Sequence, residues 1–77
     1  MTFIRTHYLE HEFIRAVWKV YPTLCAQTVA RIQYELGIEP TQAGNVEMYT
    51  VSDFDMVMQA IPKYKLVENA DGWLELA

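Results

Sequence analysis

Cysteine, glycine and proline are all scarce in this sequence of 77 residues, which contains one cysteine and three each of glycine and proline. The single cysteine, Cys25, excludes an internal disulfide and favours a reducing, cytoplasmic setting. So little glycine and proline argues against disorder and low complexity. No internal repeat is visible. Because domains usually contain at least about 100 residues, we expect residues 1–77 to form one domain rather than several.

Long hydrophobic runs are also missing. No apolar stretch approaches the roughly 20 residues that a membrane-spanning helix needs. Near the N-terminus, Arg5 and the charged or imidazole side chains from His7 to Glu12 interrupt any apolar stretch, so we expect no secretory signal. The sequence therefore predicts no membrane partner.

Basic residues are few, with 6 Lys and Arg against 10 Asp and Glu, and the formal net charge is -4. The deficit lies in the second half of the chain, because residues 1–36 sum to +1 and residues 37–77 to -5. Hydrophobic residues nevertheless make up 52% of the sequence. A domain of this size buries only about 60% of its unfolded surface, so some apolar side chains must stay exposed. They are either scattered over the surface or gathered in a patch that binds another protein or a second copy.

The spacing of apolar residues predicts two helices in the first half of the chain, over residues 6–21 and 23–36. Residues 2–5 either extend the first helix or pair as a short strand. Gly37 supplies the left-handed position after the second helix. A threonine is the expected N-cap of each helix: Thr6 and Thr23.

The second half predicts a loop over residues 39–45, a short strand over 46–51, a third helix and a C-terminal hairpin. Ser52 is the expected N-cap of the third helix, and Pro62 ends it. The hairpin comprises residues 64–68 and 73–76 with a tight turn between them. We therefore expect an α+β fold of three helices with a small antiparallel sheet ending in a C-terminal β-hairpin.

This order of elements resembles winged helix-turn-helix domains, most clearly over residues 52–76. The helix ending at Ile61-Pro62, the aromatic strand from Tyr64 and the return strand Gly72-Trp73-Leu74-Glu75-Leu76 are similar to the third helix and wing of that family. The resemblance implies that the tryptophan and leucines of the return strand pack under the helices. About 15 residues between the second and third helices depart from the short turn usual in the family. Either the first strand has moved into this gap, or the fold is another small α+β arrangement.

The resemblance implies a DNA-recognition helix over residues 53–61, but the sequence of that helix contains two carboxylates and no lysine or arginine. Affinity for duplex DNA comes largely from cations that displace condensed counterions. Only Gln59 is suited to reading bases there, and only Lys63 and Lys65 could contact phosphate. Nucleic-acid binding is therefore disfavoured, and the alternative function is a winged-helix transcriptional regulator whose homodimer supplies the missing basic surface.

Motifs for catalysis and cofactor binding are weak. His7-Tyr8-Leu9-Glu10-His11 matches the H-x-x-E-H zinc motif and would place both imidazoles on one helical face, but a hydrolytic site needs a third ligand and a cleft. We expect ordinary histidines beside Trp18. Cys25 belongs to the apolar stripe of the second helix and is expected in the core. The sequence therefore predicts no enzyme, no catalytic residues, no cofactor and no metal.

The favoured function is a small acidic protein-binding module whose partner has a basic surface. Complementary charge would raise its association rate, and aromatic anchors would supply affinity. By size and charge alone, the chain resembles phage-encoded inhibitors such as anti-CRISPR proteins, which block nucleic-acid-binding proteins. The expected contact residues are acidic or aromatic: Asp53, Asp55, Glu68, Asp71, Tyr49 and Trp73.

Overall fold

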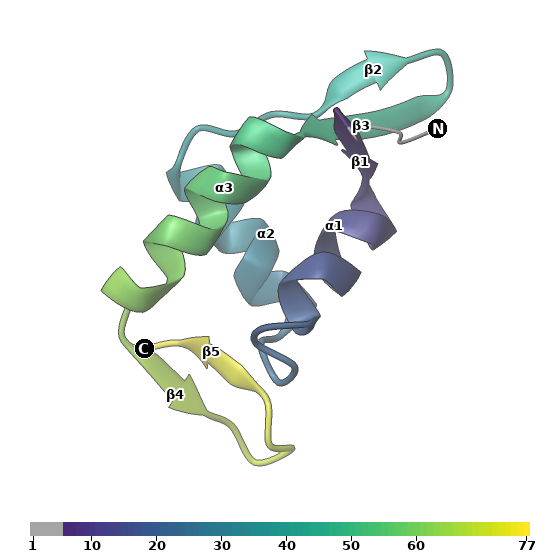
Figure 1. Cartoon of the computed structure of the whole chain (residues 1–77). Coiled ribbons are helices and arrows are strands. Elements are labelled where there is room, and N and C mark those ends of the chain that lie inside the picture. Colours follow the sequence, from purple (N-terminus) through teal and green to yellow (C-terminus); the bar gives the residue numbers. More distant parts are fainter. Residues whose placement is uncertain (1–5) are drawn as a thin grey trace.

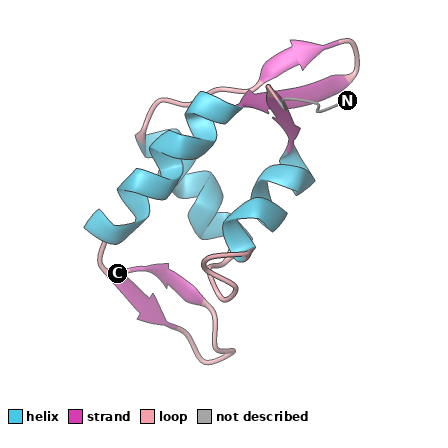
Figure 2. Ribbon diagram, in the orientation of Figure 1, coloured by secondary structure: helices cyan, strands magenta, loops and turns pink. Residues whose placement is uncertain are grey.

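A computed structural model describes residues 6–77 of the chain. Three helices lie between two small sheets, one at each end of the molecule (Figures 1 and 2). The fold is therefore α+β and ends in a β-hairpin, as predicted. In chain order, the elements are β1 (His7–Leu9), α1 (Glu10–Trp18), α2 (Ala26–Glu35), β2 (Thr41–Ala43), β3 (Val46–Thr50), α3 (Val51–Ala60), the 3-10 helix η1 (Ile61–Lys63), β4 (Leu66–Glu68) and β5 (Leu74–Leu76).

The first sheet is antiparallel in the order β1-β3-β2. Its central strand β3 confirms the strand predicted over residues 46–51, whereas the loop predicted over residues 39–45 is wrong in part, because Thr41–Ala43 forms β2. The gap between α2 and α3 therefore holds a hairpin, which pairs with β1. Three helices and a small antiparallel sheet are compatible with the winged-helix resemblance.

The first helix begins later than predicted. His7–Leu9 pairs with β3 as a strand, so α1 starts at Glu10 and Thr6 is not its N-cap. The Glu12 carboxylate, inside α1, accepts a hydrogen bond of 2.9 Å from the backbone N–H of Leu9. This bond satisfies a backbone donor at the helix start that has no partner within the helix backbone. The alternatives for residues 2–5 lie outside the described residues.

The second helix begins after Cys25 rather than after Thr23 because the chain first pairs with the C-terminal hairpin. The Leu74 N–H donates to the Thr23 carbonyl at 2.7 Å, and the Cys25 N–H donates to the Leu74 carbonyl at 3.0 Å. These bonds form a parallel bridge between Leu24 and Leu74 and keep Cys25 extended, so the helix begins only after Cys25. The predicted end of the helix is confirmed by Gly37, whose φ is 73°.

The third helix is capped by Thr50, not by Ser52. Thr50 is the extended last residue of β3, so its hydroxyl is positioned to accept the Asp53 N–H at 3.0 Å. In return, the Asp53 carboxylate accepts the Thr50 N–H at 3.1 Å. This reciprocal capping box makes Asp53 a structural residue of the helix start.

We expect Asp53→Ala to lower the free energy of unfolding by about 1 kcal/mol, because it removes half of the capping box. Asp55→Ala, two residues further along α3 and exposed, serves as the matched control and should change stability by less than about 0.5 kcal/mol. Urea denaturation followed by circular dichroism measures both values. Equal losses in the two variants would contradict the capping role.

The core lies where the three helices meet, and its largest fully buried side chains come from α1, α2, α3 and the segments that follow them. Phe13 is at the centre of an aromatic cluster, with ring centroids 5.3 Å from Tyr49, 5.4 Å from Phe54 and 6.2 Å from Tyr8. The fully buried side chains are Phe13, Leu24, Ile32, Ile61, Val17, Val29 and Val57.

The C-terminal hairpin covers the other end of the core through Leu66, Leu74 and Leu76. Its turn is held by the Asn69 side-chain oxygen, which accepts hydrogen bonds from the backbone N–H groups of Asp71 and Trp73 at 2.9 and 3.0 Å. Across residues 6–77, no helix is both long enough and apolar enough to cross a membrane.

Candidate functional site

Tyr49 was predicted to contact a partner, but the structure buries it. Only 7% of its surface is exposed, and its ring packs against Phe13 inside the aromatic cluster. Burial, followed by the charges of Glu10, Glu47 and Asp53, raises the pKa of the Tyr49 phenol. Tyr49 is therefore a neutral core residue and not part of the candidate surface.

The four predicted acidic contact residues do not form one patch. Asp53 and Asp55 lie in the first half of α3, whereas Glu68 and Asp71 lie in the hairpin beyond the other end of that helix (Figure 1). Asp53 is also half-buried by its capping role, while the other three carboxylates are exposed. Any acidic contact surface must therefore use one end of the molecule or the other.

The winged-helix resemblance implied that Trp73 packs under the helices. It does not, because 39% of its surface is exposed. Leu74 and Leu76 occupy that position instead, because alternate residues of β5 point to opposite faces. Trp73 lies against Trp18, with the ring centroids 6.0 Å apart. The Trp18 indole N–H donates to the Leu24 carbonyl at 2.7 Å, and this hydrogen bond fixes the orientation of the Trp18 ring.

The two indoles form the walls of a small apolar cavity, which we call the tryptophan cleft. Its volume is about 250 Å³, and its lining residues are Trp18, Cys25, Ala26 and Trp73. Three segments build it: the end of α1, the start of α2 and the return strand of the hairpin. The bonds between Leu74 and residues 23–25 hold the second and third of these segments together. The cleft is therefore supported by tertiary contacts rather than by one flexible loop.

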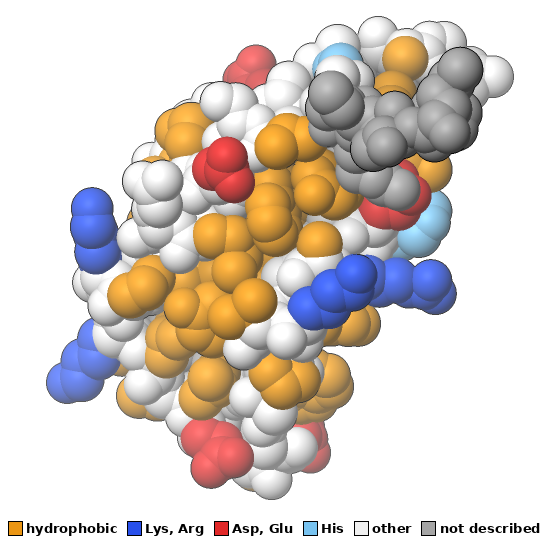
Figure 3. Space-filling model, viewed as in Figure 1, with side chains coloured by type: hydrophobic (Ala, Val, Ile, Leu, Met, Phe, Trp, Pro, Cys, Tyr) orange, Lys and Arg blue, Asp and Glu red, His pale blue; other side chains and the backbone are white. Residues whose placement is uncertain are grey.

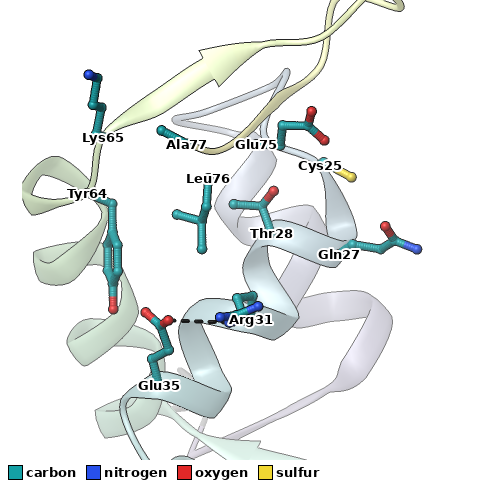
Figure 4. Close-up of a pocket in the computed structure, with 10 residues that line it drawn as sticks. All are labelled: Cys25, Gln27, Thr28, Arg31, Glu35, Tyr64, Lys65, Glu75, Leu76 and Ala77. Atoms are coloured by element: carbon teal, nitrogen blue, oxygen red, sulfur yellow. Dashed lines mark hydrogen bonds and ion pairs between the residues drawn. The ribbon is translucent and has the colours of Figure 1, made fainter.

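A second, more polar pocket of about 380 Å³ adjoins the tryptophan cleft, because Cys25 lines both cavities (Figure 4). Glu75 lies at the Cys25 end of this pocket and Lys65 at the opposite end (Figure 4). Arg31 donates to Glu35 at 3.3 Å on the floor formed by α2. Together the two cavities form one continuous surface of apolar, acidic and basic side chains.

Tyr64 closes the side of the polar pocket, with its hydroxyl directed toward Glu35 (Figure 4). Partial burial, then a hydrogen bond to the Glu35 carboxylate and the charge of that carboxylate, raise the pKa of the Tyr64 phenol. The phenol is therefore neutral at pH 7 and acts as a donor to Glu35. Arg31 and Tyr64 both bond to Glu35, so among the described residues Glu75 is the pocket glutamate that has no ion-pair partner.

The residues predicted for DNA contact are exposed, but they do not form a basic surface. Gln59 lies on the outer face of α3, whose other exposed residues are Ser52, Asp55 and Met56. Lys63 and Lys65 follow the helix, in η1 and before β4. Because α3 itself carries no lysine or arginine, only these two cations near its end could meet phosphate.

The histidines do not share a helical face, which corrects the expectation drawn from H-x-x-E-H. His7 belongs to β1, whereas His11 belongs to α1, so the helical spacing between them is lost. Among residues 6–77, no group of three or more His, Cys, Asp or Glu side chains is placed to hold a metal. Cys25 is also displaced from its expected core position, since it is half-exposed at the start of α2.

Apolar atoms also form a continuous band across α3 and toward α1 on the face seen in Figure 3. The half-buried side chains that these elements and β1 contribute include Tyr8, Phe54 and Met58, all packed against the core. Exposure of this kind is expected of a domain that buries only about 60% of its surface. Trp73 differs, because its main ring contact is a second indole in the wall of a cavity.

Sequence reasoning found Trp73 but missed Trp18, Cys25, Ala26 and Glu75 as members of the site. One signal was available: Leu74 and Leu76 share one face of the return strand, so Trp73 and Glu75 must share the other. The contribution of α1 and α2 had no such signal, because it depends on how the hairpin docks. Comparison with protein-family models, with curated proteins and with solved structures found no match to this chain.

Proposed function

We propose that this chain is a small, non-enzymatic protein-binding module whose partner presents a basic surface. The observation that carries the proposal is the tryptophan cleft, in which the exposed Trp73 lies beside Trp18 and which shares Cys25 with the pocket that holds Glu75. Tryptophan is enriched among the residues that dominate binding energy at protein interfaces, and such residues cluster in desolvated pockets. The net charge of -4 favours encounter with a cationic partner.

The partner class that best fits this chemistry is a nucleic-acid-binding protein in the same cytoplasmic setting. Such a protein maintains a basic groove for phosphates, and an acidic module can occupy that groove without reading a sequence. Inhibitors of this kind include phage anti-defence and anti-CRISPR proteins, which this chain resembles by size and charge. The proposed activity is therefore inhibition by occupancy.

Affinity capture with a matched pair of charge reversals tests this function. Glu75→Lys reverses the carboxylate beside the tryptophan cleft, while Glu39→Lys makes the same change at an exposed site before β2. We expect the unmodified chain and Glu39→Lys to capture a nucleic-acid-binding protein, and an excess of duplex DNA to prevent that capture. Glu75→Lys should lose it. Equal capture by both variants, or capture that DNA does not affect, would contradict the proposal.

A winged-helix transcriptional regulator acting as a homodimer is the alternative. It is supported by the order of three helices and a C-terminal hairpin, and by the exposure of Gln59, Lys63 and Lys65. Against it stands the absence of any cation within α3. A regulator of this class would need its second copy to supply phosphate contacts.

A salt titration on random-sequence duplex DNA separates the two functions. We expect no binding tighter than about 0.1 mM even at about 50 mM salt, because too few cations are available to release counterions. Fluorescence anisotropy of a labelled duplex measures this, and Lys63→Glu should leave the signal unchanged. Micromolar binding that weakens steeply between about 50 and 200 mM salt would favour the regulator.

A further inference from the structure

We infer that the tryptophan cleft receives an arginine side chain of the partner, with its guanidinium group directed toward Glu75. This inference rests on the proposed function and deepens it, because it names the side chain that the site recognises. The occupant is a single residue on a basic protein surface, not a second copy of this chain.

The walls of the cleft suit the carbon stem and the planar end of arginine. Trp18, Ala26 and Trp73 offer apolar surface, and the cavity of about 250 Å³ is large enough for one long side chain. A cation within about 6 Å of an indole centroid is attracted by the ring, and tryptophan is the best partner for this contact. The two indole centroids are 6.0 Å apart and the ring planes are tilted by 40°, so the rings contact each other and a cation approaches them from the open side of the cleft rather than between them.

The charge around the cleft selects a cation. Glu75 and Trp73 share a face of β5, and Cys25 connects the cavity of the indoles with the pocket that holds Glu75. Within the described part of the chain, Glu75 has no ion-pair partner. Glu75 is exposed and lines the adjoining pocket rather than the cleft itself, so an apolar occupant would gain nothing from this carboxylate, whereas a guanidinium group at the Cys25 side of the cleft would pair with it.

Within residues 6–77, the cations around the two pockets leave this position free. Arg31 is held by Glu35 on the floor of the polar pocket, and Lys65 lies at the far end from Glu75 (Figure 4). Lys19 follows Trp18 in sequence but lines a different groove, together with Arg15 and Tyr8. Among the described residues no ion pair engages the Glu75 carboxylate, so this side chain is open to a cation from another molecule.

Arginine is favoured over lysine because its guanidinium group is planar, stacks on aromatic faces and is less strongly hydrated than an ammonium group. It also presents several N–H donors to one carboxylate, which gives the contact a defined geometry. The recognised feature is thus a charged planar group on a flexible stem. Citrulline provides the matched neutral analogue, since it keeps the shape of arginine and lacks the charge.

The test uses the full chain and three capped pentapeptides that differ only at the central residue, which is arginine, citrulline or lysine and is flanked by glycines. The sequence contains two tryptophans, and both belong to the cleft, so the two indole N–H signals in a nuclear magnetic resonance titration report on it directly. We expect the arginine peptide to shift both signals with millimolar affinity and the citrulline peptide to bind at least about 10-fold more weakly. A lysine peptide should fall between them.

Three variants complete the test, each first checked by its thermal unfolding midpoint. Glu75→Gln keeps the size of the side chain and should weaken arginine-peptide binding about 5-fold, the equivalent of about 1 kcal/mol. The matched control Glu39→Gln should leave it unchanged. Trp73→Leu should abolish the response of the remaining indole.

Equal binding of the arginine and citrulline peptides, or no effect of Glu75→Gln, would overturn the inference. A dimer in light scattering that Trp73→Leu dissociates would also overturn it, because a second copy would then fill the cleft. Failure of this inference is distinct from failure of the proposed function. If the peptides do not bind but capture still depends on Glu75, arginine recognition alone is rejected. If the arginine peptide binds but no nucleic-acid-binding protein is captured, the proposed function alone is rejected.

Discussion

Phe13→Ala is expected to lower the free energy of unfolding by about 4 kcal/mol. Phe13 is completely buried and contacts the rings of Tyr8, Tyr49 and Phe54, so its removal opens a cavity among three different elements. A chain of 77 residues has a total stability of only about 4–12 kcal/mol. One truncation therefore removes a large fraction of it.

Urea denaturation followed by circular dichroism measures this loss. Phe13→Leu is the control, since it keeps most of the apolar volume and should lower stability by no more than about 1.5 kcal/mol. Phe54→Ala, at a half-buried position of the same cluster, should fall between the two. A loss below about 1.5 kcal/mol for Phe13→Ala would mean that the aromatic cluster does not hold β1, α1 and α3 together.

Leu24→Ala is the second large expected effect, with a loss of about 3 kcal/mol. Leu24 is fully buried in the connection between α1 and α2, and its neighbours in sequence form the backbone hydrogen bonds that attach the C-terminal hairpin. Because this substitution empties the space under the hairpin, we also expect the indole signals of Trp18 and Trp73 to become broader. Chemical denaturation and the same nuclear magnetic resonance spectra check both effects.

Trp73→Ala is the informative comparison for Leu24→Ala. The winged-helix resemblance implied a buried tryptophan in this strand. Truncation of a buried tryptophan would lower the free energy of unfolding by about 3 kcal/mol or more. Since Trp73 is 39% exposed and only lines the cleft, we expect a loss of about 1 kcal/mol instead. A larger effect for Trp73→Ala than for Leu24→Ala would contradict the orientation of β5.

The sequence predicted the elements best where local signals agreed. The C-terminal hairpin and the end of α2 at Gly37 depend on turn residues whose conformational preferences are local, and both are confirmed. The beginnings of all three helices were misplaced, because each is fixed by a strand or an extended segment that pairs with residues elsewhere in the chain. Thr50, for example, caps α3 only because it is also the last residue of β3.

The candidate site was less predictable than the fold. Charge and aromatic content indicated the kind of surface, and Trp73, one of the predicted contact residues, is exposed in the wall of the proposed cleft. Tyr49 looked equally suitable in sequence but lies in the core, since the position of an aromatic side chain depends on which sheet its strand joins. The part of the cleft formed by Trp18, Cys25 and Ala26 depends on contacts across more than 40 positions of the chain.

By itself, the sequence determined the α+β class, the shortage of cations in the second half and the turns that depend on glycine, because composition and backbone preference belong to individual residues. Only the tertiary structure decided that the middle hairpin joins β1 in a separate sheet, that Asp53 is a helix cap and that two distant indoles meet beside Glu75. Those outcomes depend on which segments pair and which faces are buried, and burial is a property of the whole packed chain.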